Sequence, residues 1–461
     1  MNTLAISSLG VCSALAPKRI GTELPGLDLP MPLRWAPPSG FTWSPAFAVI
    51  EAAPGVFTLN LEPTSLRVAV ARVLYVDGDV ANASASDANA GTDPALPLKS
   101  ISAALNKWNV AQTIYVKAGF YPVGNSWSSG VPFGADVNVI GVTSFATLQP
   151  GRVISSVAES GLTWSVHSTG VHKATLAAKP YAVISSHPAH APVDGGVAML
   201  TETAAPLPAS MTAGEWKHTG GVLYVATYDG ESPTGTPDTY RALRDSVRNG
   251  WVNTALSMCV ENLTFEGGAD QAFWMQNIAT GTFVDCTFTA GKALGCELNV
   301  GGGVTNSTHN VNLIRCRAVN NAGDGFGATV AGTGEAVRWL EWGCVAQGNS
   351  GAVSSDQGSS MHKSAGNGVI AAIRVAGRFG ANKSQAIADV GGCESWCVGV
   401  RCAGEVVGFF CGDAGSMWLH GCVTTGTTTD LKTDAAGGTI RHHDTQYATT
   451  AGAGTVARYA P

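Results

Sequence analysis

The sequence contains few charged residues. Only 13% of its 461 residues are Asp, Glu, Lys or Arg, and 27 basic against 33 acidic residues give a formal net charge of −6. Nucleic-acid surfaces need clustered Lys and Arg, so this balance argues against a nucleic-acid partner. No apolar run approaches the roughly 18 residues that a membrane span requires, so we expect no membrane insertion.

Cysteine is also scarce. The chain has 11 cysteines, an odd number and far below the roughly 8–10% of a disulfide scaffold. Most of them lie in apolar runs between Cys259 and Cys422, so we expect free, buried thiols and folding in a reducing cytosol. The spacing after Cys393 lacks the paired C-x2-C of structural zinc sites, and the run at 301–303 lacks the Lys of a phosphate loop. We therefore predict no metal site and no cofactor.

Glycine and hydrophobic residues are abundant, with 57 glycines and 45% hydrophobic residues, which is ample material for a large core. Short segments that alternate with period two recur about every 23–33 residues, and each is followed by a Gly- or Asn-rich turn. A period in this range indicates a repeat architecture, and the lack of helices between the strands favours an all-β solenoid. The segments are 262–265, 285–288, 315–318, 343–346, 377–379 and 421–423.

In a solenoid, each strand pairs with the coil above it at about 4.8 Å, so equivalent residues form ladders. We predict one ladder of Cys286, Cys316 and Cys344, with Phe265 and Phe288 facing inward beside it. The coil ends need capping.

A helix is predicted over 100–108, because Ile101, Ala104, Leu105 and Trp108 recur at helical spacing behind the N-cap candidate Ser100. We expect it to plug the N-terminal end of the solenoid.

Changes in amino-acid composition and pattern along the chain predict five parts. The first is Pro-rich and aromatic and is read as an irregular docking head that needs a partner surface. The parts are the head at 1–70, the start of the β-helix with its capping helix at 71–159, an inserted β-rich subdomain at 160–245, the β-helix coils at 246–425 and a C-terminal tail at 426–461.

The stretch from Tyr75-Val76-Asp77 through Pro97-Leu98-Lys99-Ser100-Ile101 to Lys117-Ala118-Gly119-Phe120-Tyr121 resembles the opening of pectate-lyase-like right-handed parallel β-helix domains. With the later coils, the resemblance covers about 300 of the 461 residues. The Pro-rich head, the arm at 214–225 and the stretch 356–362 followed by Gly366-Asn367 further resemble bacteriophage tailspike and tail-fibre proteins.

This resemblance implies a homotrimer on the virion tail, folded in the host cytoplasm. Residues 1–70 would attach to other virion tail proteins, and the β-helix flank would bind, and cleave in the depolymerase members, a host cell-surface polysaccharide. The chain departs from the large depolymerase spikes because only 424–461 follows the last coil and no heptad coiled coil is present. That departure weakens the enzymatic half of the analogy.

Glycan cleavage needs paired carboxylates, or a base with charge neutralisation. We aligned the second strand of each coil by its first apolar residue, which is Phe273, Leu294, Phe326, Val353, Ile387 or Phe410. This alignment places acids in one column with Asp389 one place away; the column is Gln276, Glu297, Thr329, Asp356, Val390 and Asp413. Our catalytic candidates are Asp356, His362, Asp389 and Glu341. The alternative interpretation is that these acids cap turns or face solvent.

For carbohydrate binding, the candidates are Trp274, Trp342 and Trp396, whose rings can stack on sugar, and Arg374, which can neutralise an acidic sugar. The alternatives are core packing for the tryptophans and plain solvation for the arginine. We favour an adhesin; the rivals are a polysaccharide-degrading enzyme and a purely structural tail component. Two outward-facing carboxylates within about 10 Å would favour the enzyme, and an exposed aromatic residue beside a groove would exclude the structural component.

Overall fold

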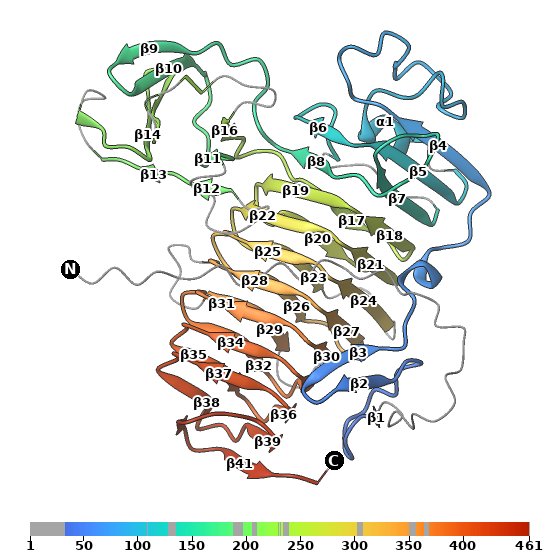
Figure 1. The fold of residues 1–461 in the computed structure, drawn as a ribbon, viewed down its shortest axis with the longest axis vertical. Helices are drawn as coiled ribbons and strands as arrows, with labels where there is room; N and C mark the ends of the chain where they lie inside the picture. The colour runs from blue at the N-terminus through green and yellow to red at the C-terminus, as the bar shows by residue number, and fades with distance from the viewer. Residues whose placement is uncertain are drawn as a thin grey trace, which may run out of the picture.

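The computed structural model describes residues 33–107, 109–127, 135–187, 197–204, 210–228, 230, 232–233, 239–301, 308–349, 356–363 and 368–460. Within these ranges the chain winds into a right-handed parallel β-helix with an extra β lobe at one end (Figure 1), which confirms the predicted fold class. None of the helices in the described ranges is long and apolar enough to cross a membrane.

Each central coil contributes one strand to each of three parallel sheets, in the order sheet 1, sheet 3, sheet 2, and the coils at the two ends lack some of these strands. In the described residues, sheet 1 contains β4 (Arg72–Val76), β5 (Gln112–Lys117), β7 (Val137–Val142), β18 (Ser257–Glu261), β21 (Thr280–Val284), β24 (Thr308–Ile314), β27 (Ala336–Trp342), β30 (Val369–Val375), β33 (Glu394–Val398), β36 (Ser416–His420), β39 (Thr439–His443) and β41 (Thr455–Arg458). Sheet 2 contains β17 (Trp251–Asn253), β20 (Phe273–Gln276), β23 (Cys296–Val300), β26 (Phe326–Val330), β29 (Gln357–Lys363), β32 (Gln385–Val390), β35 (Val407–Cys411), β38 (Thr429–Thr433) and β40 (Thr450–Ala451). Sheet 3 contains β6 (Gly119–Tyr121), β8 (Val153–Ser156), β19 (Leu263–Gly268), β22 (Thr287–Gly291), β25 (Arg317–Val319), β28 (Val345–Gln347), β31 (Arg378–Gly380), β34 (Arg401–Ala403) and β37 (Val423–Thr425).

The corner between sheet 1 and sheet 3 is sharp because one residue in each coil adopts left-handed backbone geometry. The φ angles are +62° at Asn262, +53° at Asp285, +52° at Arg315 and +64° at Gly343. Only Gly, and to a smaller degree Asn and Asp, adopt this region readily. The residue that opens the repeated segment is therefore the corner residue in these coils and at Gly421, whereas in the coil of 377–379 the corner residue is Ala376, with φ +53°.

The interior contains the predicted ladders. Cys286, Cys316 and Cys344 are buried and free. The thiol of each donates a hydrogen bond to a backbone carbonyl in the preceding coil. Phe265 and Phe288 lie in register and stack with their ring centroids 5.6 Å apart. Both predictions are confirmed, and burial raises the pKa of the Cys286 and Cys344 thiols.

The N-terminal end of the core is closed by a short helix, α1 (Ile101–Leu105). The Ser100 side chain accepts a hydrogen bond from the backbone of Ala103, as an N-cap does. Ile101 and Leu105 are fully buried against the first coils. The capping helix is thus confirmed, while Trp108 lies outside the described residues.

An extra lobe of strands lies between β8 and β17 in the chain (Figure 1). Its described part forms a five-stranded and a three-stranded sheet, with a small core that includes Trp216 and Tyr240. Its strands are β9 (Ser165–Ser168), β10 (Val171–Thr175), β11 (Ala182–Ser185), β12 (Ala198–Met199), β13 (Thr201–Glu202), β14 (Glu215–Thr219), β15 (Val222–Ala226) and β16 (Tyr240–Leu243).

Residues 33–71, which we call the strap, lie along the outer face of sheet 1 (Figure 1). The strap begins with an antiparallel sheet of β1 (Leu33–Trp35), β2 (Val49–Ala53) and β3 (Val56–Leu59) and continues through the 3-10 turn Pro63–Leu66. We expected an irregular head that docks on a partner. Its described part is instead ordered on the chain's own body.

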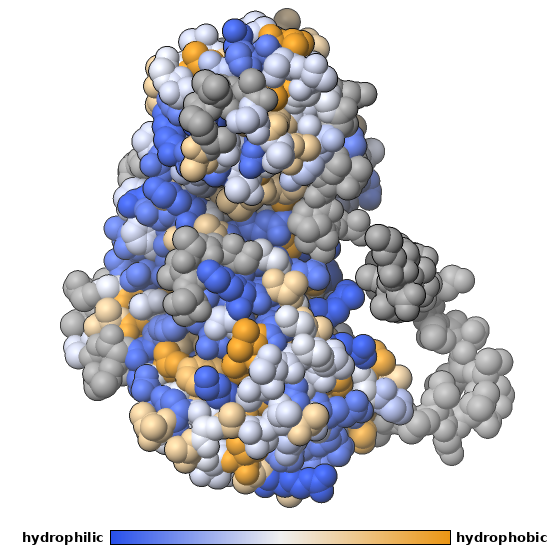
Figure 2. All heavy atoms as spheres, turned by 90° about the vertical axis from the view of Figure 1, so that its left-hand side faces the viewer, coloured by the Kyte–Doolittle hydropathy of each residue, from blue (hydrophilic) through white to orange (hydrophobic). Residues whose placement is uncertain are grey.

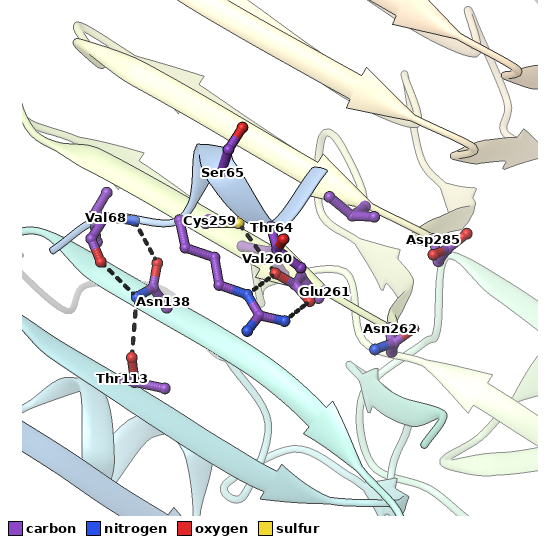
Figure 3. Close-up of polar contacts among 12 residues, drawn as sticks. Thr64, Ser65, Val68, Thr113, Asn138, Cys259, Val260, Glu261, Asn262 and Asp285 are labelled. Atoms are coloured by element: carbon purple, nitrogen blue, oxygen red, sulfur yellow. Dashed lines mark hydrogen bonds and ion pairs between the residues drawn. The ribbon is translucent and has the colours of Figure 1, made fainter. Parts of the chain in front are cut away.

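The strap reaches from the last coils back to the first. At one end, Trp35 lies over the stacked rings of His420 and His443, 4.1 Å from the His420 ring centroid. At the other end, Arg67 forms a bidentate pair with Glu261, with both N–O distances at 2.6 Å. Figure 3 shows the adjoining contacts, where the Asn138 amide bonds both backbone groups of Val68.

Candidate functional site

The corner between sheet 3 and sheet 2 is held by a ladder of buried asparagines. Asn321 donates its amide to Asn349 at 3.0 Å, and Asn349 donates to Asn382 at 2.9 Å. These bonds satisfy buried polar groups that would otherwise be costly. They also fix the turn that precedes each sheet 2 strand, where Asp324 and Asp356 lie in consecutive coils.

Glu297 lies on β23 and points outward, because its neighbours Cys296 and Leu298 face the core. It is only 6% exposed. The Gln271 amide donates to one carboxylate oxygen, and the Thr329 hydroxyl approaches the other at 3.5 Å. Burial, assisted by the negative charge of Asp324, raises the pKa of Glu297 to about 7.

Asp324 directly precedes Gly325 and β26, one coil beyond Glu297, and is half-buried. It accepts hydrogen bonds from the Ser360 hydroxyl at 2.7 Å and from the backbone of Gln357 at 2.8 Å. Burial raises the pKa of Asp324 and the nearby charge of Asp356 raises it further, whereas these hydrogen bonds and His362 act in the opposite direction.

Asp356 directly precedes β29 in the next coil, and His362 lies near the other end of that strand. Asp356 is only 2% exposed, and His362 lies half-buried beside Thr329 in the adjacent strand. The structure therefore brings Glu297, Asp324 and Asp356 to one corner over three successive coils, with His362 further along β29. Carboxyl groups with raised pKa values next to other acids mark a candidate catalytic site.

An aromatic pair extends the same outer face. Trp274 pairs in register with Glu297, and beyond it Trp251 stacks on Trp274 with ring centroids 6.4 Å apart. The Arg248 guanidinium lies 4.4 Å from the Trp274 ring centroid and 5.2 Å from that of Trp251. Of the predicted sugar-binding residues, Trp274 therefore lies one coil from the carboxylates.

Three other predicted residues differ from the outward positions that we expected. Glu341, Arg374 and Asp389 are fully buried inside the solenoid. Arg374 forms a bidentate pair with Asp389, with both N–O distances at 2.9 Å, and its Nε donates to Ser359. Contact with a polymer outside the coils is not open to these side chains, so they do not form the predicted acid–base set.

Trp342 and Trp396 lie on the outer face of sheet 1 under the strap. Trp396 is 2% exposed. They pack with strap residues such as Phe57 and Leu59 instead of forming a sugar platform. Core packing, the alternative that we kept open, describes both.

The sequence alignment missed Asp324 and placed the acidic column in the wrong register. The strand register puts Gln276 and Thr329 in line with His362, not with Glu297 or Asp356. Val353, used to align Asp356, lies outside the described residues, and the β29 residue equivalent to Phe326 is Ser359. An Asp immediately before the Gly-Phe of β26, next to an Asn-rich turn, is the signal that could have identified Asp324.

No known protein family and no curated protein matches the sequence. Among solved structures, a glycoside hydrolase is 12% identical over 84% of this chain and 96% of its own, with a TM-score of 0.43. Pectate lyase Pel9A is 12% identical over 85% and 80%, with a TM-score of 0.40. The Pseudomonas phage phi297 tailspike gp61 is 10% identical over 81% and 70%, with a TM-score of 0.23. Similarity this low does not extend to function.

Proposed function

We propose that this protein binds a polysaccharide along the outer face of sheet 2 and hydrolyses it at the corner formed by Glu297, Asp324 and Asp356. The observation that carries the proposal is the presence of three acids on successive coils. Burial and the charge of Asp324 raise the pKa of Glu297, and burial and the charge of Asp356 raise the pKa of Asp324. Adjacent coils are about 4.8 Å apart, and Asp324 lies one coil on and three residues before the position that pairs with Glu297. The proposed hydrolysis requires the two carboxyl groups to meet at the roughly 6.5–9.5 Å of a pair that activates water directly.

In the proposed reaction, Glu297 is the acid. A carboxyl group with a pKa of about 7 is largely protonated at neutral pH and donates its proton to the glycosidic oxygen as the C–O bond breaks. Asp324, the more accessible acid, acts as the base that takes a proton from the attacking water. Asp356 and His362 set the charge around Asp324.

The aromatic pair and the polar surroundings support a sugar polymer as the ligand. Trp274 provides ring surface one coil from Glu297, and Gln276 and Asn299 stand on the same outer face. The side of the molecule seen in Figure 2 is hydrophilic over most of its area, with small separate hydrophobic areas. Such a surface suits a hydrated chain better than an apolar ligand.

The resemblance in the sequence supports a finer proposal. The protein would serve as a phage tailspike or tail-fibre adhesin, as a homotrimer on the virion tail, with a host surface polysaccharide as its ligand. Residues 33–71 are engaged with the body, so attachment to other tail proteins would use residues 1–32.

The test is to incubate the protein with surface polysaccharides from candidate host bacteria and follow chain length by size-exclusion chromatography. Glu297→Gln and Asp324→Asn should each abolish shortening. Asp413→Asn removes an exposed acid from a distant corner and should leave shortening intact.

If Asp324→Asn shortens the polysaccharide at the wild-type rate, the assignment of this corner as the catalytic site is wrong. If the wild-type protein and its variants bind the polysaccharide but none of them shortens it, the function is adhesion without hydrolysis. If the wild-type protein neither binds nor shortens any of the polysaccharides, the structural alternative is favoured.

A further inference from the structure

Sheet 3 carries a second, chemically different outer surface. Its outward-facing column contains Arg317, Val345, Arg378, Arg401 and Val423, each directly in register with the next. These side chains point outward because the alternating residues, such as Phe379 and Cys402, lie in the core. β25, β28, β31 and β34 face the viewer in Figure 1.

Arg378 and Arg401 occupy neighbouring positions in this column, and both are exposed. Within the described part of the chain, neither side chain forms an ion pair or donates a hydrogen bond. Glu405, which follows four residues after Arg401, is buried and accepts the amide of Asn382 at 3.2 Å. Two like charges directly opposite each other in a sheet repel, and an anion bound between them would remove that repulsion.

The surface beside the two arginines is flat. Two positions further along each strand, the outward-facing residues are Gly380, Ala403 and Thr425. The nearest atoms to a Cβ added at Gly380 would be the Ala403 carbonyl oxygen at 3.3 Å and the Gln347 side chain at 3.7 Å. The arginines therefore stand beside a shallow strip that leaves room for an extended chain.

We propose that the outer face of sheet 3 binds a linear anionic polysaccharide through Arg378 and Arg401, independently of the carboxylate corner. Guanidinium groups recognise carboxylate and phosphate through paired hydrogen bonds. Coils about 4.8 Å apart present the two cations along one line, as a polymer with charges along its length requires. The charge complementarity is specific to this face, because the corner at Glu297 and Asp324 is acidic.

A nucleic acid fits this strip less well. Single-stranded nucleic acids are held by aromatic side chains on which the bases stack, and the column from Thr264 to Val423 has none. The net charge of −6 also opposes binding of a long polyanion anywhere outside this strip.

The test measures binding by affinity electrophoresis of the full chain at low salt. Polygalacturonate supplies carboxylates, a teichoic acid supplies phosphates, neutral dextran is the uncharged control, and single-stranded DNA is the competing polyanion. The double variant Arg378→Gln/Arg401→Gln should weaken binding to the anionic glycan at least tenfold. Arg338→Gln with Arg458→Gln removes the same charge from exposed positions on sheet 1 and should not.

Asp324→Asn should keep full binding on this face, which separates the present proposal from the proposed hydrolysis. Preference for polygalacturonate or for teichoic acid identifies the anionic group. Equal binding by the double variant and its control, no binding of either glycan by the wild type, or tighter binding of DNA than of both glycans would each overturn the proposal.

Discussion

The buried ion pair inside the coils allows a quantitative prediction about stability. Arg374, Asp389 and Glu341 are fully enclosed, and Arg374 is 3.5 Å from Glu341 in addition to its two bonds with Asp389. Burial by itself would lower the pKa of Arg374, but the charges of Asp389 and Glu341 outweigh it and raise that pKa. Asp389→Asn removes the balancing charge while keeping the size of the side chain.

Removing one partner of a buried pair destabilises a protein by about 3–5 kcal/mol, because the other charge stays buried without compensation. We expect Asp389→Asn to lose about 3 kcal/mol of its free energy of unfolding, the lower end of that range, because Glu341 remains 3.5 Å from Arg374 and balances part of its charge. The double variant Arg374→Met/Asp389→Leu removes both charges of the pair. Glu341 then loses the Arg374 charge that lowers its pKa, and because burial raises that pKa, its carboxyl group takes up a proton. Most of the loss should therefore be recovered.

The assay is guanidinium unfolding followed by circular dichroism, with unfolding rates as a second readout because long solenoids can unfold irreversibly. Asp413→Asn, an exposed acid, is the control and should change stability by less than about 0.5 kcal/mol. A loss below about 1 kcal/mol in Asp389→Asn would refute the buried-pair argument. A double variant less stable than Asp389→Asn would show instead that the site cannot accept apolar packing.

Two further predictions concern pH. The pKa of Glu297 is raised to about 7 from 4.5, so any hydrolysis should decline as pH rises through about 7. The stability of the fold should fall between about pH 4.5 and 7, because the folded state holds a proton there that the unfolded state has lost. Glu297→Gln should flatten this pH dependence of the free energy of unfolding, and an unchanged slope would contradict the raised pKa. Burial and the neighbouring His443 lower the pKa of His420 below its usual 6.5, against the smaller opposite effects of Asp444 and Glu51. The strap should therefore loosen as pH falls below about 6.5, which limited proteolysis would detect as faster cleavage within residues 33–62. His420→Gln should reduce this pH dependence.

The repeat and its core ladders could be predicted from the sequence because they depend on local rules. A two-residue alternation, a polar or glycine corner residue and a recurring Cys or Phe specify which residues stack, as Cys286 above Cys316 shows. The same reasoning located α1 from its Ser100 cap and its buried face. Each of these signals is contained within one or two coils.

The inward and outward faces of sheet 1 could not be assigned in this way. In β30 the outward residues Ile373 and Val375 are apolar because the strap covers them, while Arg374 points inward. Alternation alone does not show which of the two sets of residues in a strand faces the core. The strap decides this for β30, and it lies more than 300 residues earlier in the chain. The register of sheet 2 was lost for a related reason, since the turns before its strands differ in length from coil to coil.

The misassigned interior residues still bear on the site, because one strand connects them. On β29, Ser359 faces inward and donates to Glu341 at 2.6 Å, while the next residue, Ser360, faces outward and donates to Asp324 at 2.7 Å. Arg374 also donates to the Ser359 hydroxyl. The buried cluster thus fixes the position of the strand from which Asp324 receives its hydrogen bond, and a small shift of that strand would change the pKa of Asp324 and its distance from Glu297. Asp389→Asn should therefore reduce any cleavage by more than its loss of folded protein explains, and full activity per folded molecule would show that the interior cluster acts on stability alone.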